Sequence, residues 1–425
     1  MTSRWAESLR PGYWRSAEAD CHMPHACWRH ETGEHVVRRA FKFRAYPTRP
    51  QQGRAVRLLR DHCDLYNAAL EERRGAWGQC GVRVGYNDQS AQLREIRRND
   101  AVGQGRHSFT AQQQTLRRLD ATFGAFFRRA KAKSLRAGYP RFKPYQRFNQ
   151  VRFVAGDGAK WVPADAGHWA HASFQAVGQL KVKQHRPVRG RVKTLQLKRE
   201  GRRWYVVVVA EMDAEPLPPT GRAVGIDVGV ARFLTTSDGQ IVRNPRFLAT
   251  AQARIAHLQR SKERARPGSG NRKRLRRALA KEWRKVRNQR RDFHHKTART
   301  LVTAYDVLAL EDLHIGGLTA SARGTVAEPG RNVAQKAGLN RSILDAAWGQ
   351  FARILVAKAE SAGRRVIGVD PGYTSLACHA CGARCTRPKQ DTVVCPSCGA
   401  QDADLNGARN IATRAGLGSG QALVA

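Results

Sequence analysis

Apolar and polar positions follow regular patterns along the first half of the chain and predict strands and amphipathic helices. Residues 36–48 (VVRRAFKFRAYPT) alternate apolar and basic side chains, which predicts a strand with Phe41 and Phe43 on one face. Beyond Pro47, apolar residues recur every three or four positions, which predicts two helices that each bury one face. The first helix carries Val56, Leu59, Cys63, Tyr66 and Leu70, and the second carries Leu116, Leu119, Phe123 and Phe126. Residues 178–212 return to a strand pattern that ends at the proline-rich EPLPPTG, which we interpret as a domain boundary.

Short apolar runs mark the second half of the chain and predict buried strands. These runs are AVGID (223–227), VLALE (307–311) and RRVIGV (364–369). A basic helical hairpin is predicted at 251–300, interrupted at RPGSGN. The polar, Gly-rich stretch 316–338 predicts a mobile loop, and a helix is predicted to begin near Asn340.

The charge of the chain indicates what it binds, because 76 Lys and Arg stand against 34 Asp and Glu. The formal net charge of +42 and a pI near 11.2 favour a polyanion, and nucleic acid is the natural one. An anionic membrane is the rival hypothesis. The sequence, however, contains no apolar run near the ~18 residues of a spanning helix and opens with no secretory signal. We therefore expect a cytoplasmic, DNA-associated protein of a prokaryote.

Five of the nine cysteines fall within 21 residues, which indicates metal binding in a reducing compartment rather than disulfides. Two CxxC knuckles separated by 13 residues supply four of them, Cys378, Cys381, Cys395 and Cys398. Four thiolates at this spacing enclose one tetrahedral zinc ion, with a β-hairpin between the knuckles. Gly382 and Gly399 follow the knuckles, where tight turns favour glycine. The sequence predicts a closed, structural zinc ribbon that leaves out Cys385 and His379.

Three acidic residues stand out in so basic a chain. Asp227 ends AVGID, Glu311 ends VLALE, and Asp404 lies at the predicted start of a final helix, DADLNGARNIA. Taken singly, acids are common at strand ends and helix N-termini. Together they match an RNase H-like fold, in which two strands and a late helix bring three carboxylates around two Mg²⁺ ions that cleave a phosphodiester. Asp402 is the less favoured of its pair, because Asp404 begins the D-x-N unit.

Six motifs, in this order, resemble the TnpB family of transposon-encoded nucleases: GIDVGV, LALEDL, LNRSILDAAWGQF, VDPGYTSLACHACG, CPSCG and DADLNGARNIA. Upstream, FKFRAYPT, LYNAALEER and GYPRFK resemble the N-terminal part of that family, so the resemblance covers roughly residues 36–413. It implies a multidomain α/β protein. The expected parts are an RNase H-like (RuvC) nuclease domain with an inserted zinc ribbon, a wedge β-barrel and a helical recognition part.

The resemblance also implies an activity, which is RNA-guided cleavage of double-stranded DNA beside a short target-adjacent motif. The guide RNA would derive from the transposon end, and a monomer bound to RNA is expected, although the sequence leaves the oligomeric state open. Asp227, Glu311 and Asp404 match the family's catalytic triad, which holds two Mg²⁺ ions, and the four cysteines match the ligands of one structural Zn²⁺. Gly407 stands where the family's D-x-N-A-A pattern has an alanine.

Four alternatives stay open at this point. Small type V CRISPR effectors share these motifs, and a transposase would use the same acids to join DNA strands without RNA. A non-cleaving RNA-guided repressor would need only the ribbon and the basic surface, whereas all three acids are present. A plain zinc-ribbon RNA-binding protein would leave Asp227 and Glu311 unexplained.

Pattern and resemblance together divide the chain into successive parts. These are a poorly ordered leader at 1–35, the first wedge strand at 36–49, a helical recognition domain at 50–135, the rest of the wedge barrel at 136–218, the first nuclease part at 219–372, the zinc ribbon at 373–399, the last nuclease part at 400–416 and a tail at 417–425. The ribbon is thus expected to interrupt the nuclease domain just before its last acid.

Overall fold

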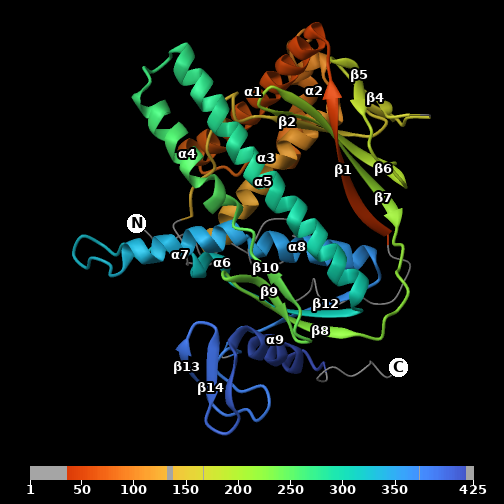
Figure 1. Cartoon of the computed structure of the whole chain (residues 1–425). Coiled ribbons are helices and arrows are strands. Elements are labelled where there is room, and N and C mark those ends of the chain that lie inside the picture. Colours follow the sequence, from red (N-terminus) through yellow and green to blue (C-terminus); the bar gives the residue numbers. More distant parts are fainter. Residues whose placement is uncertain (1–35, 132–136, 166, 373, 418–425) are drawn as a thin grey trace.

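The computed structural model describes residues 36–131, 137–165, 167–372 and 374–417. The predicted leader at 1–35 and all but the first residue of the predicted tail lie outside these ranges. Three β-sheets with their helices make up the described chain, with the N-terminal sheet at one end, the cysteine ribbon at the other and the second sheet between them (Figure 1). None of the helices in the described ranges combines the length and hydrophobicity of a membrane span.

Seven strands form the N-terminal sheet in the order β2-β6-β7-β1-β5-β4-β3. Their bounds are β1 Val36–Tyr46, β2 Gln150–Val154, β3 Ala159–Val162, β4 Trp169–Phe174, β5 Gly178–Lys183, β6 Arg191–Glu200 and β7 Arg203–Asp213. β1 pairs antiparallel with almost the whole of β7, and the edge strand β3 packs close to β6, so the sheet curls into a nearly closed barrel. Phe41 and Phe43 are buried inside it, which confirms the predicted strand and its inner face.

Three helices lie between β1 and β2 in the chain. α1 Arg49–Cys80 and α3 Phe109–Lys131 pack on β2 of the barrel, and α2 Tyr86–Asn99 packs on α3. The predicted stripe of α1 is buried, with Val56 only half-buried, and the helix begins at a capping box between Thr48 and Gln51. The stripe of α3 is likewise buried up to Phe123. α2 was not predicted, because it buries a single large apolar residue, Leu93, beside the polar Gln89.

The second sheet has five strands in the order β10-β9-β8-β11-β12. Their bounds are β8 Ala223–Val228, β9 Arg232–Thr236, β10 Ile241–Arg243, β11 Val307–Glu311 and β12 Arg365–Val369. β8, β11 and β12 run parallel and β9 and β10 antiparallel, which is the arrangement of an RNase H-like domain. Side chains alternate along β11. Leu308 and Leu310 join the core beneath helices α5 (Gly270–Ala304) and α8 (Trp348–Ser361), whereas Val307 and Ala309 join the core beneath α9 (Ala403–Arg414).

The helices of this domain are α4 Phe247–Arg264, α5 Gly270–Ala304, α6 Ile315–Leu318, α7 Val333–Ala346, α8 Trp348–Ser361 and α9 Ala403–Arg414. α4 and α5 form the predicted basic hairpin, which extends beyond 251–300 at both ends and rises alongside the barrel (Figure 1). Arg287 of α5 reaches the Glu200 carboxylate of β6 at 3.4 Å.

The predicted loop at 316–338 and the predicted helix from Asn340 were partly wrong. α6 takes the first residues of that stretch, and α7 is already helical at Val333. The expected single helix is two helices, because Ala347 adopts a φ of 53° between α7 and α8. The left-handed conformation costs an alanine about 1–2 kcal/mol, so tertiary packing must impose it. The sequence around Ala347 therefore does not indicate the break.

The cysteine ribbon is a three-stranded antiparallel sheet of β13 Thr386–Lys389, β14 Thr392–Cys395 and β15 Gly399–Asp402. β15 continues to Asp402, three residues beyond the expected end of the ribbon at 399, and α9 begins at the next residue. The last strand of the ribbon is therefore connected directly to the helix that carries Asp404.

Candidate active site and cysteine ribbon

Two of the predicted acids lie at the ends of neighbouring parallel strands. β8 pairs with β11 with Ile226 opposite Leu310, and Asp227 and Glu311 are the next residues on each strand. Because parallel strands end at the same edge of a sheet, both carboxylates belong to the edge where α/β folds place their sites.

Small residues let α9 lie directly on β8 and bring the third acid to this edge. A Cβ added at Gly225 would stand 2.2 Å from the carbonyl oxygen of Ala408, so helix and strand meet there through backbone. A Cβ added at Gly407 would stand 3.3 Å from Asp227 Oδ2. Asp404 lies one turn before Gly407 on the same helix, which places it beside Asp227.

Asp402 and Asp404 have different surroundings. Asp402 caps α9, since its Oδ1 accepts the N–H of Leu405 at 2.9 Å, and its Oδ2 accepts Arg232 Nη1 at 2.7 Å. Burial opposes ionisation, but these bonds hold the pKa of Asp402 below its ordinary value. Asp404 is left with one long contact in this group, 3.6 Å from its Oδ2 to Arg232 Nη1.

Burial and mutual repulsion act on the three acids. Burial raises the pKa of Asp227 to about 7, and the charges of Glu311 and Asp404 add to the rise. Burial also raises the pKa of Glu311, against a hydrogen bond from Thr374, and the pKa of Asp404, against the charge of Arg232. Buried acids that repel one another favour a cation among them.

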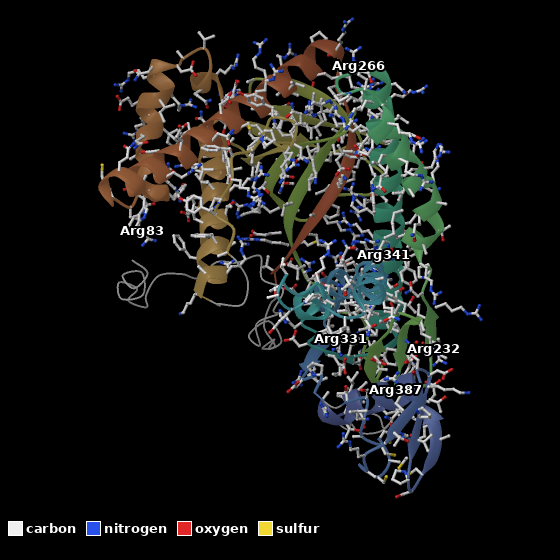
Figure 2. All side chains as sticks on the ribbon, turned by 90° about the vertical axis from the view of Figure 1, so that its left-hand side faces the viewer. Arg83, Arg232, Arg266, Arg331, Arg341 and Arg387 are labelled. Atoms are coloured by element: carbon white, nitrogen blue, oxygen red, sulfur yellow. The ribbon has the colours of Figure 1, made fainter. Side chains whose placement is uncertain are left out.

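Two arginines flank these acids. Arg232 from β9 and Arg387 from β13 lie at the junction of the second sheet and the ribbon (Figure 2). The charge of Arg387 lowers the pKa of both Asp227 and Asp404, so this ribbon residue acts electrostatically on the site. Its Nε also donates to the carbonyl of Gln390 at 3.1 Å.

The four predicted cysteine ligands come together. Their Sγ atoms all lie within 4.8 Å of one another, and those of Cys381 and Cys395 are 3.5 Å apart. Sulfurs bound at ~2.3 Å to one tetrahedral zinc stand ~3.8 Å apart, so the group has the size of a metal site. Gly382 and Gly399 adopt φ of 75° and 78°, as predicted for tight turns. Among the described residues, no group of carboxylates is gathered as tightly.

Cys385 and His379 lie outside this group of four. Cys385 is buried beside it, and burial raises the pKa of its thiol to about 11, helped by the charges of Cys395 and Cys378. The His379 ring lies between Asn406 Oδ1, 3.1 Å from Nδ1, and Arg409 Nη1, 2.9 Å from Nε2. Because arginine only donates, Nε2 accepts and Nδ1 carries the proton, so both ring nitrogens are engaged.

Sequence reasoning missed the polar residues that hold the acids in place. Thr374 donates a hydrogen bond to Glu311, and Arg232 pairs with Asp402. Asn406 and Asn410 contact the chain around the first knuckle, and their spacing of four residues was a usable signal for one helix face. Thr374 and Arg232 leave no such signal, because they meet their partners only through the fold.

Two family models match separate parts of the chain. A model described as "Probable transposase" matches residues 205–322, which include β8 and β11 with Asp227 and Glu311. A model described as "Cas12f1-like, TNB domain" matches residues 348–411, from α8 through the ribbon into α9.

Relatives match over most of the chain. The InsQ protein of Escherichia coli (strain K12), named provisionally as an RNA-guided DNA endonuclease, is 33% identical over 317 residues, 74% of this chain and 75% of that protein. A Streptomyces pristinaespiralis protein with the same provisional name is 31% identical over 380 residues, 88% of this chain and 89% of its own length. The TnpB-like protein L770 of Acanthamoeba polyphaga mimivirus is 24% identical over 263 residues, 59% of this chain and 49% of that protein.

A solved structure shares the fold. It is the cryo-EM structure of a Cas12f1–sgRNA–target DNA complex, with a TM-score of 0.54, 13% identity, and coverage of 88% of this chain and 98% of that one. At this identity the likeness concerns the fold alone. On the sequence matches to its relatives, the chain belongs to the TnpB family.

Proposed function

We propose that this chain is a transposon-encoded, RNA-guided endonuclease that cleaves double-stranded DNA beside a short target-adjacent motif. The observation that supports it most is the convergence of Asp227, Glu311 and Asp404 from β8, β11 and α9 on one edge of an RNase H-like sheet. The names of its relatives and a net charge of +42 support RNA and DNA as partners.

The three acids fit magnesium as its ligands. They offer only carboxylate oxygens, the donors that Mg²⁺ prefers, and burial makes their charge costly in the absence of a cation. When bound, two Mg²⁺ ions would activate a water and stabilise the leaving oxygen of a phosphodiester. The three carboxylates would bind these ions. Because the pKa of Asp227 is near 7, its carboxyl group is protonated below that pH and must lose the proton before it binds an ion.

The four cysteines fit one structural zinc ion. All four positions would be taken by protein thiolates, so the site is closed and serves the fold rather than the chemistry. Cys378 is prepared for this role, since the backbone N–H of Cys381 and that of Ala380 lower the pKa of its thiol to about 5.

The remaining parts of the chain would hold the nucleic acids. We assign 36–49 and 136–218 to the wedge barrel, 50–135 to target recognition, 219–372 and 400–416 to the nuclease, and 373–399 to the ribbon. The basic hairpin α4–α5 stands alongside the barrel, where it would line a channel for a guide–target heteroduplex held by its backbone (Figure 1).

The test begins with RNA. The chain is expressed together with its flanking DNA, the RNA that copurifies is sequenced, and the complex is given Mg²⁺ and a plasmid library with random flanks beside the guide-matched target. We expect one discrete RNA and cutting beside a fixed motif. Asp227→Asn abolishes the cutting, whereas Asp402→Asn, which keeps the helix cap, retains it.

Each other outcome selects an alternative. A bound RNA with target binding but without cutting indicates a repressor. Joined DNA ends without any need for RNA indicate a transposase, to which the "Probable transposase" description points. A guide flanked by a CRISPR repeat indicates a small type V effector.

A further inference from the structure

Asn406 of α9 holds the first cysteine knuckle by its backbone. Its Nδ2 donates to the carbonyl of Ala377 at 2.8 Å, and its Oδ1 accepts the N–H of His379 at 2.9 Å. These two backbone groups flank Cys378, so one side-chain amide fixes the chain on both sides of a cysteine. Asn406 is only 1% exposed, so water does not replace these bonds when they are lost.

Asn410 repeats the contact one turn further along α9. Its Nδ2 donates to the carbonyl of Thr374 at 2.8 Å and to that of Ala377 at 2.7 Å. Residues four apart lie on the same face of a helix, so both asparagines bind the segment 374–379 from one face of α9. α9 is thereby fastened to the chain that enters the first knuckle.

The same segment also reaches a carboxylate. The hydroxyl of Thr374 donates to Glu311 Oε1, and Thr374 is buried with 4% of its surface exposed. A carboxylate at the end of a strand has free rotation about its side-chain bonds, and this hydrogen bond selects one orientation. Thr374 therefore joins the knuckle segment to Glu311.

A different part of α9 faces the other two acids. Gly407 lies against Asp227, Ala408 lies against Gly225 of β8, and Asp404 stands on the first turn. Any shift of α9 along its axis would move Asp404 relative to Asp227. The asparagines resist such a shift from the ribbon side.

We propose that Asn406, Asn410 and Thr374 are positioning residues that couple the cysteine site to the three carboxylates. The inference rests on the proposed function, because it assigns zinc to the cysteines and magnesium to the acids. Zinc fixes the position of Cys378. The hydrogen bonds of the two asparagines then fix α9, and with it Asp404, and the hydrogen bond of Thr374 fixes the carboxylate of Glu311. Since coupling between two binding sites is reciprocal, a divalent ion at the acids also strengthens the binding of zinc.

The first test uses Thr374, whose hydroxyl can be removed without changing the shape of the side chain. Binding of Mn²⁺, a spectroscopic substitute for Mg²⁺, is measured by electron paramagnetic resonance on the full-length, zinc-loaded protein. We expect Thr374→Val to weaken Mn²⁺ binding about 10-fold. Thr374→Ser restores the affinity, and zinc content by mass spectrometry is one per chain in both variants. Thr413→Val removes an exposed hydroxyl from α9 and serves as the matched control with unchanged affinity.

The second test measures reciprocity through Asn410. The equilibrium between zinc on the protein and zinc on a zinc-selective colorimetric chelator is measured with and without Mn²⁺. In the wild type Mn²⁺ strengthens zinc binding several-fold, and in Asn410→Ala zinc binding is weaker and insensitive to Mn²⁺.

The outcomes separate three cases. If Thr374→Val binds Mn²⁺ as tightly as the wild type, or if the zinc affinity of the wild type does not respond to Mn²⁺, the coupling is overturned and the asparagines only hold the ribbon. Asp227→Asn is measured in parallel. If it binds Mn²⁺ as the wild type does, the magnesium site itself is misplaced, and the proposed function fails together with the inference.

Discussion

The cysteine cluster and the acidic edge are two candidate metal sites in the part of the chain that the structure describes, and they are built in opposite ways. The four cysteines come from two short knuckles, and their sulfurs lie within 4.8 Å of one another. The three acids come from two strands and a helix far apart in the sequence; burial raises the pKa of each, and for Asp227 the charges of the other two add to the rise. The first site is assembled by local turns, whereas the second exists only when the whole domain has folded.

This difference predicts which substitutions make each site lose its metal ion. A local site loses its metal when one ligand is lost, because the ligands are most of what holds it together. A site made by the fold also fails when the packing that brings its ligands together is disturbed, at residues that never touch the metal. The following predictions test this contrast.

The largest effect is expected for Asp227→Asn. Losing one ligand of the catalytic ions removes several kcal/mol of transition-state stabilisation, which is roughly a thousandfold in cleavage rate. Zinc content and RNA binding remain unchanged, because the substitution lies at the other site. Single-turnover cleavage and zinc analysis of one preparation give both answers. A variant that loses zinc together with cleavage indicates that Asp227 is needed for the fold of the ribbon rather than as a ligand of the catalytic ions alone.

Cys395→Ser is expected to reduce zinc from one per chain to none and to unfold the ribbon. Cys385→Ser, at a buried cysteine that lies beside the four ligands but not among them, keeps its zinc. Mass spectrometry of the intact protein counts the metal, and limited proteolysis reports the ribbon. Equal zinc loss in both variants indicates that Cys385 is a ligand.

Gly225→Ala tests the packing that makes the acidic edge. Its methyl group meets the Ala408 carbonyl at 2.2 Å and the Ala412 nitrogen at 2.6 Å, so strand and helix must separate. We expect the free energy of unfolding to fall by about 1–3 kcal/mol, with cleavage reduced as well. Gly407→Ala is the matched control: its methyl group needs only a few tenths of an ångström from the Asp227 side chain, and unfolding measured by calorimetry should barely change. A Gly225→Ala protein as stable as the wild type contradicts this account of the helix–strand contact.

A smaller effect is expected from pH on the metal-binding acids alone. Folding raises the pKa of Asp227 from 3.8 to about 7, so the folded, metal-free chain prefers the proton. The contribution of this group to stability therefore falls as pH rises from about 4 to about 7, and a cation restores it. Mn²⁺ should bind about 10-fold more weakly at pH 6 than at pH 8, because the ion must displace that proton. Equal affinity at the two pH values argues against a protonated Asp227.

The sequence predicted the cysteine cluster and the first strand well, because the period and spacing that make them are local. It also predicted the strands that end in Asp227 and Glu311, since apolar runs closed by an acid are visible in the sequence. The break at Ala347 was missed, because nothing in an alanine favours a left-handed backbone. Thr374 was missed for a related reason: its hydroxyl matters only because β12 and β11 lie side by side and bring its segment to Glu311.

The turn between β13 and β14 has a practical consequence for engineering. Gln390 and Asp391 form this turn, and the carbonyl of Asp391 accepts the N–H of Ala403 at 2.9 Å, at the start of the helix that carries Asp404. Every residue of β13 is exposed, so the turn looks like a convenient place for a peptide tag. An insertion between Gln390 and Asp391 would, however, separate Arg387 from the start of α9, so cargo placed there would disturb the carboxylates that it is meant to accompany.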